Sequence, residues 1–209
     1  MLIKVCGMRD PENVKELVEE VVPDLMGMIF YPKSSRYVKE ENQMISQSKV
    51  KKVGVFVNTN IETILEMEAT YGLSYIQLHG DEEFGFVKTL SERSQAGIIK
   101  VFRVEAGIEW EALQPYQPYV KYFLFDTQTK KFGGSGKKFD WSVLEEYPLE
   151  KPFLLSGGID DKSALSLLEL QKKVPKMAGV DINSKFEIEP ALKDIIKIKT
   201  FVTELRSGH

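Results

Sequence analysis

The sequence contains a single cysteine, Cys6, among 209 residues. A lone thiol cannot form a disulfide within the chain, and such chains are typical of the cell interior. No apolar stretch approaches the roughly 20 residues that a membrane-spanning helix needs. The first apolar run, from Leu2 to Cys6, carries a lysine and is predicted to be a strand rather than a signal peptide. We therefore expect a soluble, cytoplasmic protein.

The chain also lacks a large excess of either charge. It has 28 basic and 31 acidic side chains and a formal net charge of −3. This balance argues against a broad surface for nucleic acid or for a membrane, so an anionic ligand has to be held by a few placed groups. The length suits one well-buried core better than two full domains. We expect residues 1–209 to form a single domain that acts as a monomer or a homodimer.

Short apolar runs alternate with amphipathic segments along the whole chain. The runs cover residues 2–6, 25–30, 53–57, 75–78, 98–104, 120–125, 152–155 and 177–182. Helix starts are predicted at or just after Asp10, Glu40, Asn60, Asp81, Trp110, Asp140, Asp160 and Pro190. Near-continuous apolar strands indicate burial on both faces, as in parallel sheets. Eight such units favour a closed (β/α)8 TIM barrel with eight parallel strands, and a doubly wound sheet of five or six strands is the alternative.

Cys6 is the first candidate for chemistry, because sites in this barrel form at the C-terminal ends of the strands. It ends the first run, directly before Gly7. Successive side chains of a strand alternate in direction, so Lys4 shares the side of Cys6. A positive charge there lowers the pKa of the thiol and makes the thiolate available. The competing interpretations are an ordinary buried thiol for Cys6 and a core ion pair with Asp181 for Lys4.

Asp126 follows the sixth apolar run, from Tyr122 to Phe125. Burial of a carboxyl group after such a run raises its pKa and makes it a proton donor near neutral pH, although a turn or helix-cap aspartate is the alternative. Strands one and six lie three places apart in a ring of eight, so Cys6 and Asp126 are expected to face each other across the mouth. An acid and a base placed in this way can act on opposite parts of one small substrate.

Two glycine-rich segments are candidates for binding phosphate. Gly133-Gly134-Ser135-Gly136 follows the sixth run, and it matches neither a Walker loop nor the dinucleotide pattern, so a flexible surface loop is the alternative. Ser156-Gly157-Gly158 ends the seventh run before a predicted helix, where backbone N–H groups can hold an anion. Loops after strands seven and eight are the usual phosphate site in this fold.

Arg36 and His79 lie in two further loops that follow apolar runs. The guanidinium of an arginine matches a carboxylate in two-point geometry, although a solvated loop charge is the simpler interpretation of Arg36. His79 can donate or accept a hydrogen bond in the mouth, and a structural histidine is the alternative.

Several short segments in a fixed order match a known family. They are KVCG at 4–7, FYPKSSRYV at 30–38, VGVFVN at 53–58, IQLHG at 76–80, Asp126, GGSGK at 133–137, FDW at 139–141, LSGGI at 155–159 and GVD at 179–181. A set of motifs that each close a predicted strand is far more specific than any single one. Over nearly its whole length, the chain resembles the phosphoribosylanthranilate isomerase family of tryptophan biosynthesis.

The resemblance implies a barrel enzyme that needs no metal or organic cofactor. Its reaction is the Amadori rearrangement of N-(5′-phosphoribosyl)anthranilate to 1-(2-carboxyphenylamino)-1-deoxyribulose 5-phosphate. It implies that Asp126 is the general acid at the furanose ring oxygen and that Cys6 is the general base at C2′. It further implies that Arg36 binds the anthranilate carboxylate. The phosphate would be bound by the glycines named above and by the strand-eight loop, with Asn183 and Ser184.

The sequence departs from the family pattern at two places. Ser35 stands where proline is common, in the loop that carries Arg36. After Asp181 the family usually shows two small hydroxyl residues and a glycine, whereas this chain has Asn183-Ser184-Lys185-Phe186-Glu187. Lys185 in place of glycine removes backbone freedom from that part of the phosphate site. Its ammonium group is a candidate ligand of the phosphate instead.

Two other functions are alternatives at this point. A related barrel isomerase of histidine biosynthesis performs the same rearrangement on a larger bis-phosphate substrate, but it has a carboxylate where Cys6 stands. A barrel that only binds a sugar phosphate has no need of an acid–base pair. One cysteine and one apparent phosphate site favour the smaller substrate and a catalytic role.

Overall fold

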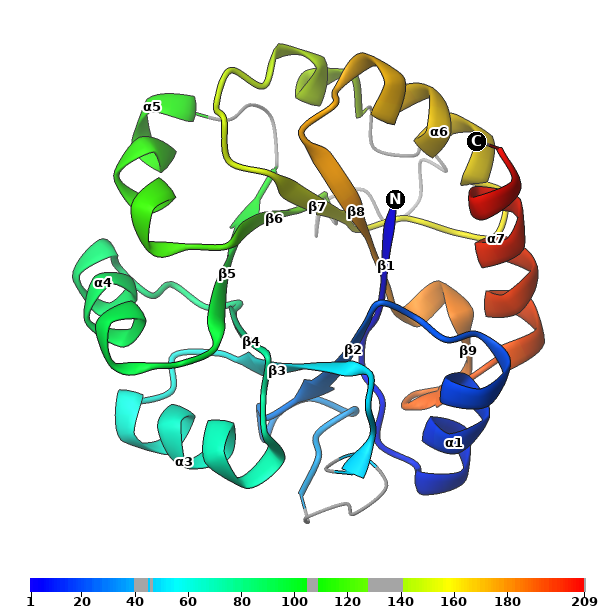
Figure 1. Ribbon diagram of the computed structural model, residues 1–209, viewed down its shortest axis with the longest axis horizontal. Helices are drawn as coiled ribbons and strands as arrows, with labels where there is room; N and C mark the ends of the chain where they lie inside the picture. Colours follow the sequence, from blue (N-terminus) through cyan, green and yellow to red (C-terminus); the bar gives the residue numbers. More distant parts are fainter. Residues whose placement is uncertain (40–44, 46, 105–108, 128–140, 209) are drawn as a thin grey trace.

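Eight parallel strands pair in chain order and close into a barrel, with the helices around its outside (Figure 1). The computed structural model describes residues 1–39, 45, 47–104, 109–127 and 141–208. The barrel strands are β1 (Leu2–Val5), β2 (Leu25–Ile29), β3 (Lys51–Phe56), β4 (Tyr75–Leu78), β5 (Gly97–Arg103), β6 (Tyr122–Asp126), β7 (Phe153–Ser156) and β8 (Met177–Ile182). Because β1 pairs with both β2 and β8, the barrel is closed, and the prediction of a (β/α)8 barrel over a doubly wound sheet is confirmed.

Each predicted apolar run coincides with a barrel strand, with ends that differ by up to two residues. The largest differences are at β3, which begins at Lys51 instead of Val53, and at β6, which begins at Tyr122 instead of Val120. Lys51 and Lys52 pair with Leu25 and Met26 of β2, so backbone pairing carries the strand beyond its apolar run. Hydrophobicity alone therefore does not mark the ends of a strand, and it misses Lys52, which is buried within β3.

The helices lie outside the barrel, and some of them begin where capping residues predict. They are α1 (Pro11–Glu20), α3 (Ile61–Tyr71), α4 (Phe84–Arg93), α5 (Trp110–Leu113), α6 (Ala164–Lys173) and α7 (Ile195–Ser207), with 3-10 turns η1 (Gln114–Tyr119), η2 (Trp141–Glu146) and η3 (Ser184–Phe186). The side chain of Asp10 accepts from Asn13 N, and that of Asn60 accepts from Thr63 N. Gly72 ends α3 with a left-handed backbone, φ 58°. These caps confirm the predicted starts of α1 and α3.

Three predicted helix starts are wrong. Helix α4 follows Glu83, because the Asp81 backbone N–H donates to Asn58 Oδ1 in the preceding loop. Helix α6 starts four residues after Asp160, whose carboxylate accepts from Ser163 Oγ and closes a turn. The expected starts at Glu40 and Asp140 lie outside the described residues.

The third error is at Pro190, which does not start the last helix. The chain first forms a small antiparallel hairpin, β9 (Glu187–Glu189) and β10 (Leu192–Lys193). Helix α7 begins only at Ile195, where Asp194 accepts from Lys197 N. The hairpin follows β8 after the single 3-10 turn η3, so it lies near the C-terminal end of the barrel.

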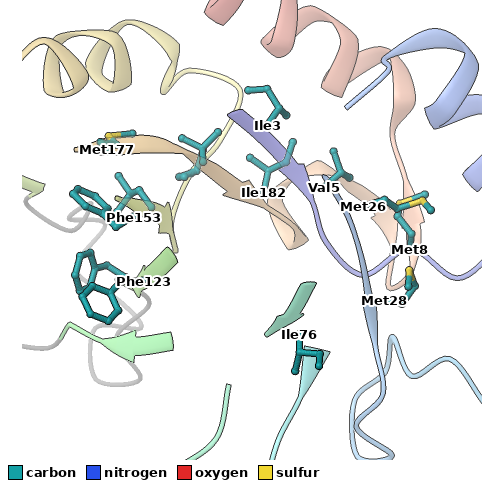
Figure 2. Close-up of a cluster of buried hydrophobic side chains, with 14 of the residues drawn as sticks. Ile3, Val5, Met8, Met26, Met28, Ile76, Phe123, Phe153, Met177 and Ile182 are labelled. Atoms are coloured by element: carbon teal, nitrogen blue, oxygen red, sulfur yellow. The ribbon is translucent and has the colours of Figure 1, made fainter. Parts of the chain in front are cut away.

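Two apolar layers fill the molecule, one outside the strands and one inside. Figure 2 shows part of the outer layer, where Ile3 and Val5 of β1 gather with Met26 of β2 and Ile182 of β8. The inner cluster consists of Leu25, Val53, Ile99, Val101, Leu124 and Leu154, with Tyr75, Tyr122 and Ala178 packed against it. Since alternate residues of a strand point to opposite faces, Lys4 of β1 faces inward with the second set. Cys6, directly after β1, lies on the same side as Lys4, next to Gly27.

In the described part of the chain, no helix is both long and apolar enough to cross a membrane.

Candidate active site

The C-terminal ends of the barrel strands, called the mouth below, carry polar side chains that strand pairing aligns from β5 to β1. Strand pairing sets Arg103 beside Asp126, Asp126 beside Ser156, Ser156 beside Asp181, and Asp181 beside Lys4. This register runs from β5 through β8 to β1. The sequence-based prediction that Asp126 and the end of β1 lie at the same end of the barrel therefore agrees with the strand register.

Lys4 is fully buried inside the barrel and donates to Asp181 Oδ1 at 2.8 Å. The Asp181 side chain is 5% exposed, so both charges are removed from water. Buried charges are tolerated when they are paired, which explains why this lysine can occupy the barrel interior. The core ion pair considered as the alternative for Lys4 is therefore present.

Cys6 lies directly after β1, and 4% of it is exposed. Gly27 of β2 makes room for it, because a Cβ at Gly27 would lie 2.9 Å from Cys6 Sγ and 3.1 Å from Lys4 Nζ. Burial raises the pKa of the thiol, while the charges of Lys4 and Lys193 lower it and the charge of Asp181 raises it. The charge of Lys4 thus lowers the pKa as expected, but burial outweighs this effect and the net pKa is raised.

Asp126 ends β6 and faces His79 across the mouth. His79 Nε2 lies 3.4 Å from Asp126 Oδ2. Strands β4 and β6 are separated by β5, so this contact passes over the inner face of β5. On the other side of the imidazole, Gln77 Nε2 lies 3.0 Å from His79 Nδ1. His79 is therefore held between a buried amide and the carboxyl group of Asp126, with 29% of its side chain exposed to the mouth.

Arg36 reaches the mouth from the loop after β2, and it is already engaged by a carboxylate of the protein. Its Nε donates to Glu187 Oε1 at 2.8 Å and its Nη2 donates to Oε2 at 2.5 Å. Hydrogen bonding to Glu187 raises the pKa of Arg36. The side-chain stem passes over Gly7, where a Cβ would lie 2.7 Å from Arg36 Cδ. Gly7 has φ 80°, a conformation that favours glycine, and it is the neighbour of Cys6 in the chain.

Glu187 and Lys193 belong to this site, although sequence reasoning did not select them. Lys193 Nζ donates to Glu187 Oε1 and to Asn183 Oδ1, both at 2.7 Å. The two residues are paired across the hairpin of β9 and β10. This pairing was not predicted, because Pro190 was expected to start a helix and not to lie within a hairpin. The alternation of Glu187, Ile188 and Glu189 was the one signal for a strand.

The candidate phosphate residues lie around the ends of β7 and β8. Gly157 and Gly158 have φ 87° and 67°, and nothing lies within 4 Å of a Cβ built on Gly158. The loop is tied to β6 by Thr127, whose hydroxyl donates to the carbonyls of Ser156 at 2.9 Å and of Gly157 at 3.0 Å. These glycines were predicted to lie just before a helix starting at Asp160, but α6 begins only at Ala164, so they lie farther from its first turn.

In the loop after β8, Ser184 and Lys185 are exposed, and the side chain of Asn183 is bound to Lys193. Lys185 is not among the described residues with positive φ, so its backbone conformation does not require glycine. Its carbonyl accepts from Lys197 Nζ at 2.8 Å. Gly133, Gly134, Ser135 and Gly136 lie outside the described residues. Within residues that are described, no group of three or more His, Cys, Asp and Glu side chains could hold a metal ion.

The whole chain is similar to proteins of one known family. Residues 3–204 match the family model described as "N-(5'phosphoribosyl)anthranilate (PRA) isomerase". The N-(5′-phosphoribosyl)anthranilate isomerase of Parabacteroides distasonis is 45% identical, with 98% of this chain and 93% of the relative covered. That of Phocaeicola vulgatus is 44% identical, with 99% and 98% covered.

Solved structures agree with the sequence relatives. Phosphoribosyl anthranilate isomerase from Thermotoga maritima has a TM-score of 0.82 and 30% identity, with 99% of this chain and 100% of that chain covered. A phosphoribosyl anthranilate isomerase in complex with reduced 1-(o-carboxyphenylamino)-1-deoxyribulose 5-phosphate has a TM-score of 0.78 and 28% identity, with the same coverage.

Proposed function

The chain belongs to the N-(5′-phosphoribosyl)anthranilate isomerase family, and from that premise we propose that Cys6 and Asp126 are the base and the acid of its reaction. The protein catalyses the Amadori rearrangement of N-(5′-phosphoribosyl)anthranilate to 1-(2-carboxyphenylamino)-1-deoxyribulose 5-phosphate, a step of tryptophan biosynthesis. The histidine-pathway isomerase and the non-catalytic barrel receive no support from the family model or from these relatives.

In the first step, the carboxyl group of Asp126 donates a proton to the furanose ring oxygen. The bond between C1′ and that oxygen breaks, and the lone pair of the anthranilate nitrogen forms a C=N bond to C1′. The product is an open-chain cationic Schiff base with a free hydroxyl group. The position of Asp126 at the end of β6, facing into the mouth, supports this role.

In the second step, the thiolate of Cys6 removes the proton from C2′. The electrons of the C–H bond form a C1′=C2′ bond and neutralise the nitrogen, which gives an enolamine. The enolamine then tautomerises, as the C2′ hydroxyl loses its proton and C1′ gains one, to give the ketose. The thiol of Cys6 first loses its own proton to water in the mouth, because the cationic Schiff base beside it favours the thiolate. A thiolate whose thiol has a raised pKa is a strong base.

The remaining candidates bind and orient the substrate. Arg36 binds the anthranilate carboxylate, next to Cys6 across Gly7. Gly157 and Gly158 offer backbone N–H groups to the phosphate. The other proposed phosphate ligands are Gly133, Gly134, Ser135 and Gly136, outside the described residues, and Asn183 and Ser184 of the loop after β8.

Three further residues have supporting roles in the proposal. Lys4 stabilises the thiolate, since its charge lowers the pKa of Cys6 against the effect of burial. His79 orients the carboxyl group of Asp126. The exposed ammonium of Lys185 attracts the phosphate. We propose that residues 1–209 work as one barrel domain, in the cytoplasm.

The observation that carries this proposal is the placement of Cys6 and Asp126 at the same end of one barrel. The direct test is turnover by the purified chain with N-(5′-phosphoribosyl)anthranilate, and in parallel with the bis-phosphate aldose of histidine biosynthesis. The proposal expects the ketose product from the first substrate and loss of turnover on replacing Cys6 or Asp126. Full activity in both variants would reject the assigned roles.

A further inference from the structure

Glu187 holds Arg36 along only one of the two edges of its guanidinium. The edge formed by Nε and Nη2 donates to the two oxygens of Glu187 at 2.8 and 2.5 Å. A guanidinium can bind a second carboxylate along the edge formed by its two Nη atoms. Among the described residues, Nη1 makes no hydrogen bond, and 20% of the Arg36 side chain is exposed. Arg36 can therefore hold Glu187 and a ligand carboxylate at the same time.

Glu187 is held by several hydrogen bonds, so a substrate carboxylate is not expected to displace it from Arg36. Its Oε1 accepts from Arg36 Nε at 2.8 Å, from Lys193 Nζ at 2.7 Å and from Ala191 N at 3.1 Å. Only 5% of its side chain is exposed. Burial alone would raise its pKa, but the hydrogen bonds from Arg36 and Lys193 outweigh burial and lower the pKa to about 2. The carboxylate is thus ionised at neutral pH and surrounded by donors.

Lys193 connects this carboxylate to the rest of the fold. Its side chain is fully buried, and its Nζ also donates to Asn183 Oδ1 at 2.7 Å. The side-chain amide of Asn13 in α1 makes two hydrogen bonds to the backbone of Lys193. Its Oδ1 accepts from Lys193 N at 2.7 Å, and its Nδ2 donates to Lys193 O at 3.0 Å. The two cations and one anion leave the group of Arg36, Glu187 and Lys193 with a net positive charge. An incoming carboxylate therefore meets a favourable potential.

The group lies beside the catalytic thiol. A Cβ built on Gly7 would lie 2.7 Å from Arg36 Cδ, 2.8 Å from Asn183 Oδ1 and 3.4 Å from Lys193 Nζ. Gly7 follows Cys6 directly in the chain. A change in the direction of the guanidinium would therefore shift an anthranilate ring relative to the base.

We propose that Glu187, backed by Lys193, is a positioning residue that fixes one edge of Arg36 so that the other edge receives the substrate carboxylate. The inference rests on the role of Arg36 proposed above. It assigns to the hairpin of β9 and β10 a part in substrate selection, because recognition of the carboxylate depends on how Glu187 aims the guanidinium. A merely structural Glu187 would affect all ligands alike.

The test compares two ligands that differ only in the carboxylate. One is the reduced product 1-(o-carboxyphenylamino)-1-deoxyribulose 5-phosphate, and the other is the same compound without the ring carboxylate. Calorimetry on Glu187→Gln should show about tenfold or greater weakening for the first ligand and less than about twofold for the second. In turnover, KM should rise by a similar factor with kcat changed far less. Glu145→Gln, which removes the exposed pair with Lys173, is the matched control and should behave as the wild type.

Each other outcome overturns the inference. Equal weakening of both ligands would make Glu187 structural only, and unchanged binding would give it no part in recognition. Tighter binding of the carboxylate ligand would show that Glu187 competes with the substrate for Arg36. Arg36→Met separates this inference from the proposed function on which it rests. If Arg36→Met weakens binding of the carboxylate ligand alone and Glu187→Gln does not, only the positioning role of Glu187 fails. If Arg36→Met also weakens both ligands equally or neither of them, the role assigned to Arg36 fails as well.

Discussion

Lys4 and Asp181 form an ion pair of 2.8 Å inside the barrel, one inward-facing position below Cys6. The lysine serves two acidic groups, because its charge acts on both the carboxylate and the thiol. The interaction of Lys4 with Asp181 is stronger than its interaction with Cys6. The negative charge of Asp181 also raises the pKa of Cys6. Cys6 therefore rests as a neutral thiol in a dry environment. In the proposed mechanism it becomes a base only when a cationic substrate intermediate lies beside it.

The first prediction concerns the acid–base pair. Cys6→Ala and Asp126→Asn should each lower kcat by about 100-fold or more, because each removes one proton-transfer step. Far-ultraviolet circular dichroism and the melting temperature should show a folded barrel in both variants. A variant with kcat within about twofold of the wild type would rule out the role assigned to the residue it replaces.

The second prediction concerns the buried pair beneath the thiol. Lys4→Met should destabilise the fold by about 3–5 kcal/mol, because it leaves the Asp181 carboxylate buried without a partner. Lys4→Met/Asp181→Asn should recover most of that loss, since no uncompensated charge remains. Urea unfolding of the two variants and the wild type measures both quantities. Equal stability of the single and double variants would contradict the pairing.

The third prediction concerns the ionisation of Cys6. Its pKa should lie above the ordinary thiol value of about 8.5, because burial outweighs the nearby cations. The thiolate absorbance of the wild type, minus that of Cys6→Ser to remove the contribution of the tyrosines, measures the midpoint directly. The limb of the kcat/KM profile that reports Cys6 should accordingly lie on the alkaline side of neutrality. A midpoint below the ordinary value would contradict the effect of burial.

The fourth prediction concerns stability in acid. The pKa of Glu187 falls from 4.5 to about 2 on folding, so the stabilisation by its ionised form is present above the higher value and is lost as pH falls towards the lower. The wild type should lose up to about 3 kcal/mol more than Glu187→Gln over this range. Urea unfolding at several acidic pH values measures the difference. Parallel curves for the two proteins would show that Glu187 is not stabilised by Arg36 and Lys193.

The fifth prediction separates crowding at the site from backbone strain. Gly7→Ala places a methyl group 2.7 Å from Arg36 Cδ at a residue with φ 80°, and Gly72→Ala has comparable strain at φ 58° with only Lys52 Nζ near, at 3.9 Å. Both variants should lose about 1–2 kcal/mol of stability from the left-handed conformation. Only Gly7→Ala should raise KM, because only that methyl group displaces Arg36. An equal KM in the two variants would contradict the placement of Arg36 over Gly7.

Patterns of hydrophobicity were sufficient to predict the barrel. Parallel strands are buried on both faces, so each leaves an apolar run that sequence alone reveals. Cys6, His79 and Asp126 end or directly follow such runs, and for that reason they were predicted to lie at the C-terminal ends of the strands. The strand register aligns Asp126 with Ser156 at the end of β7 and with Asp181 near the end of β8, and His79 meets Asp126 across β5.

The errors arose where contacts between distant residues decide the structure. The pKa of Cys6 depends on the competition between burial, Lys4 and Asp181, and the charge order along one strand does not reveal it. Pro190 is a good helix start by local rules, but the pairing of Glu187 with Lys193 and Arg36 favours a hairpin there. The family resemblance implies that Arg36 binds a substrate carboxylate, yet only the structure shows that the carboxylate of Glu187 already binds it.

A crystal structure with the reduced product 1-(o-carboxyphenylamino)-1-deoxyribulose 5-phosphate bound would show whether Cys6 and Asp126 act on one substrate. We expect one pentose chain to contact both residues, with Cys6 Sγ at C2 and an Asp126 oxygen at the hydroxyl released from the ring. A ligand whose sugar chain contacts only one of the two residues, or neither, would contradict this expectation.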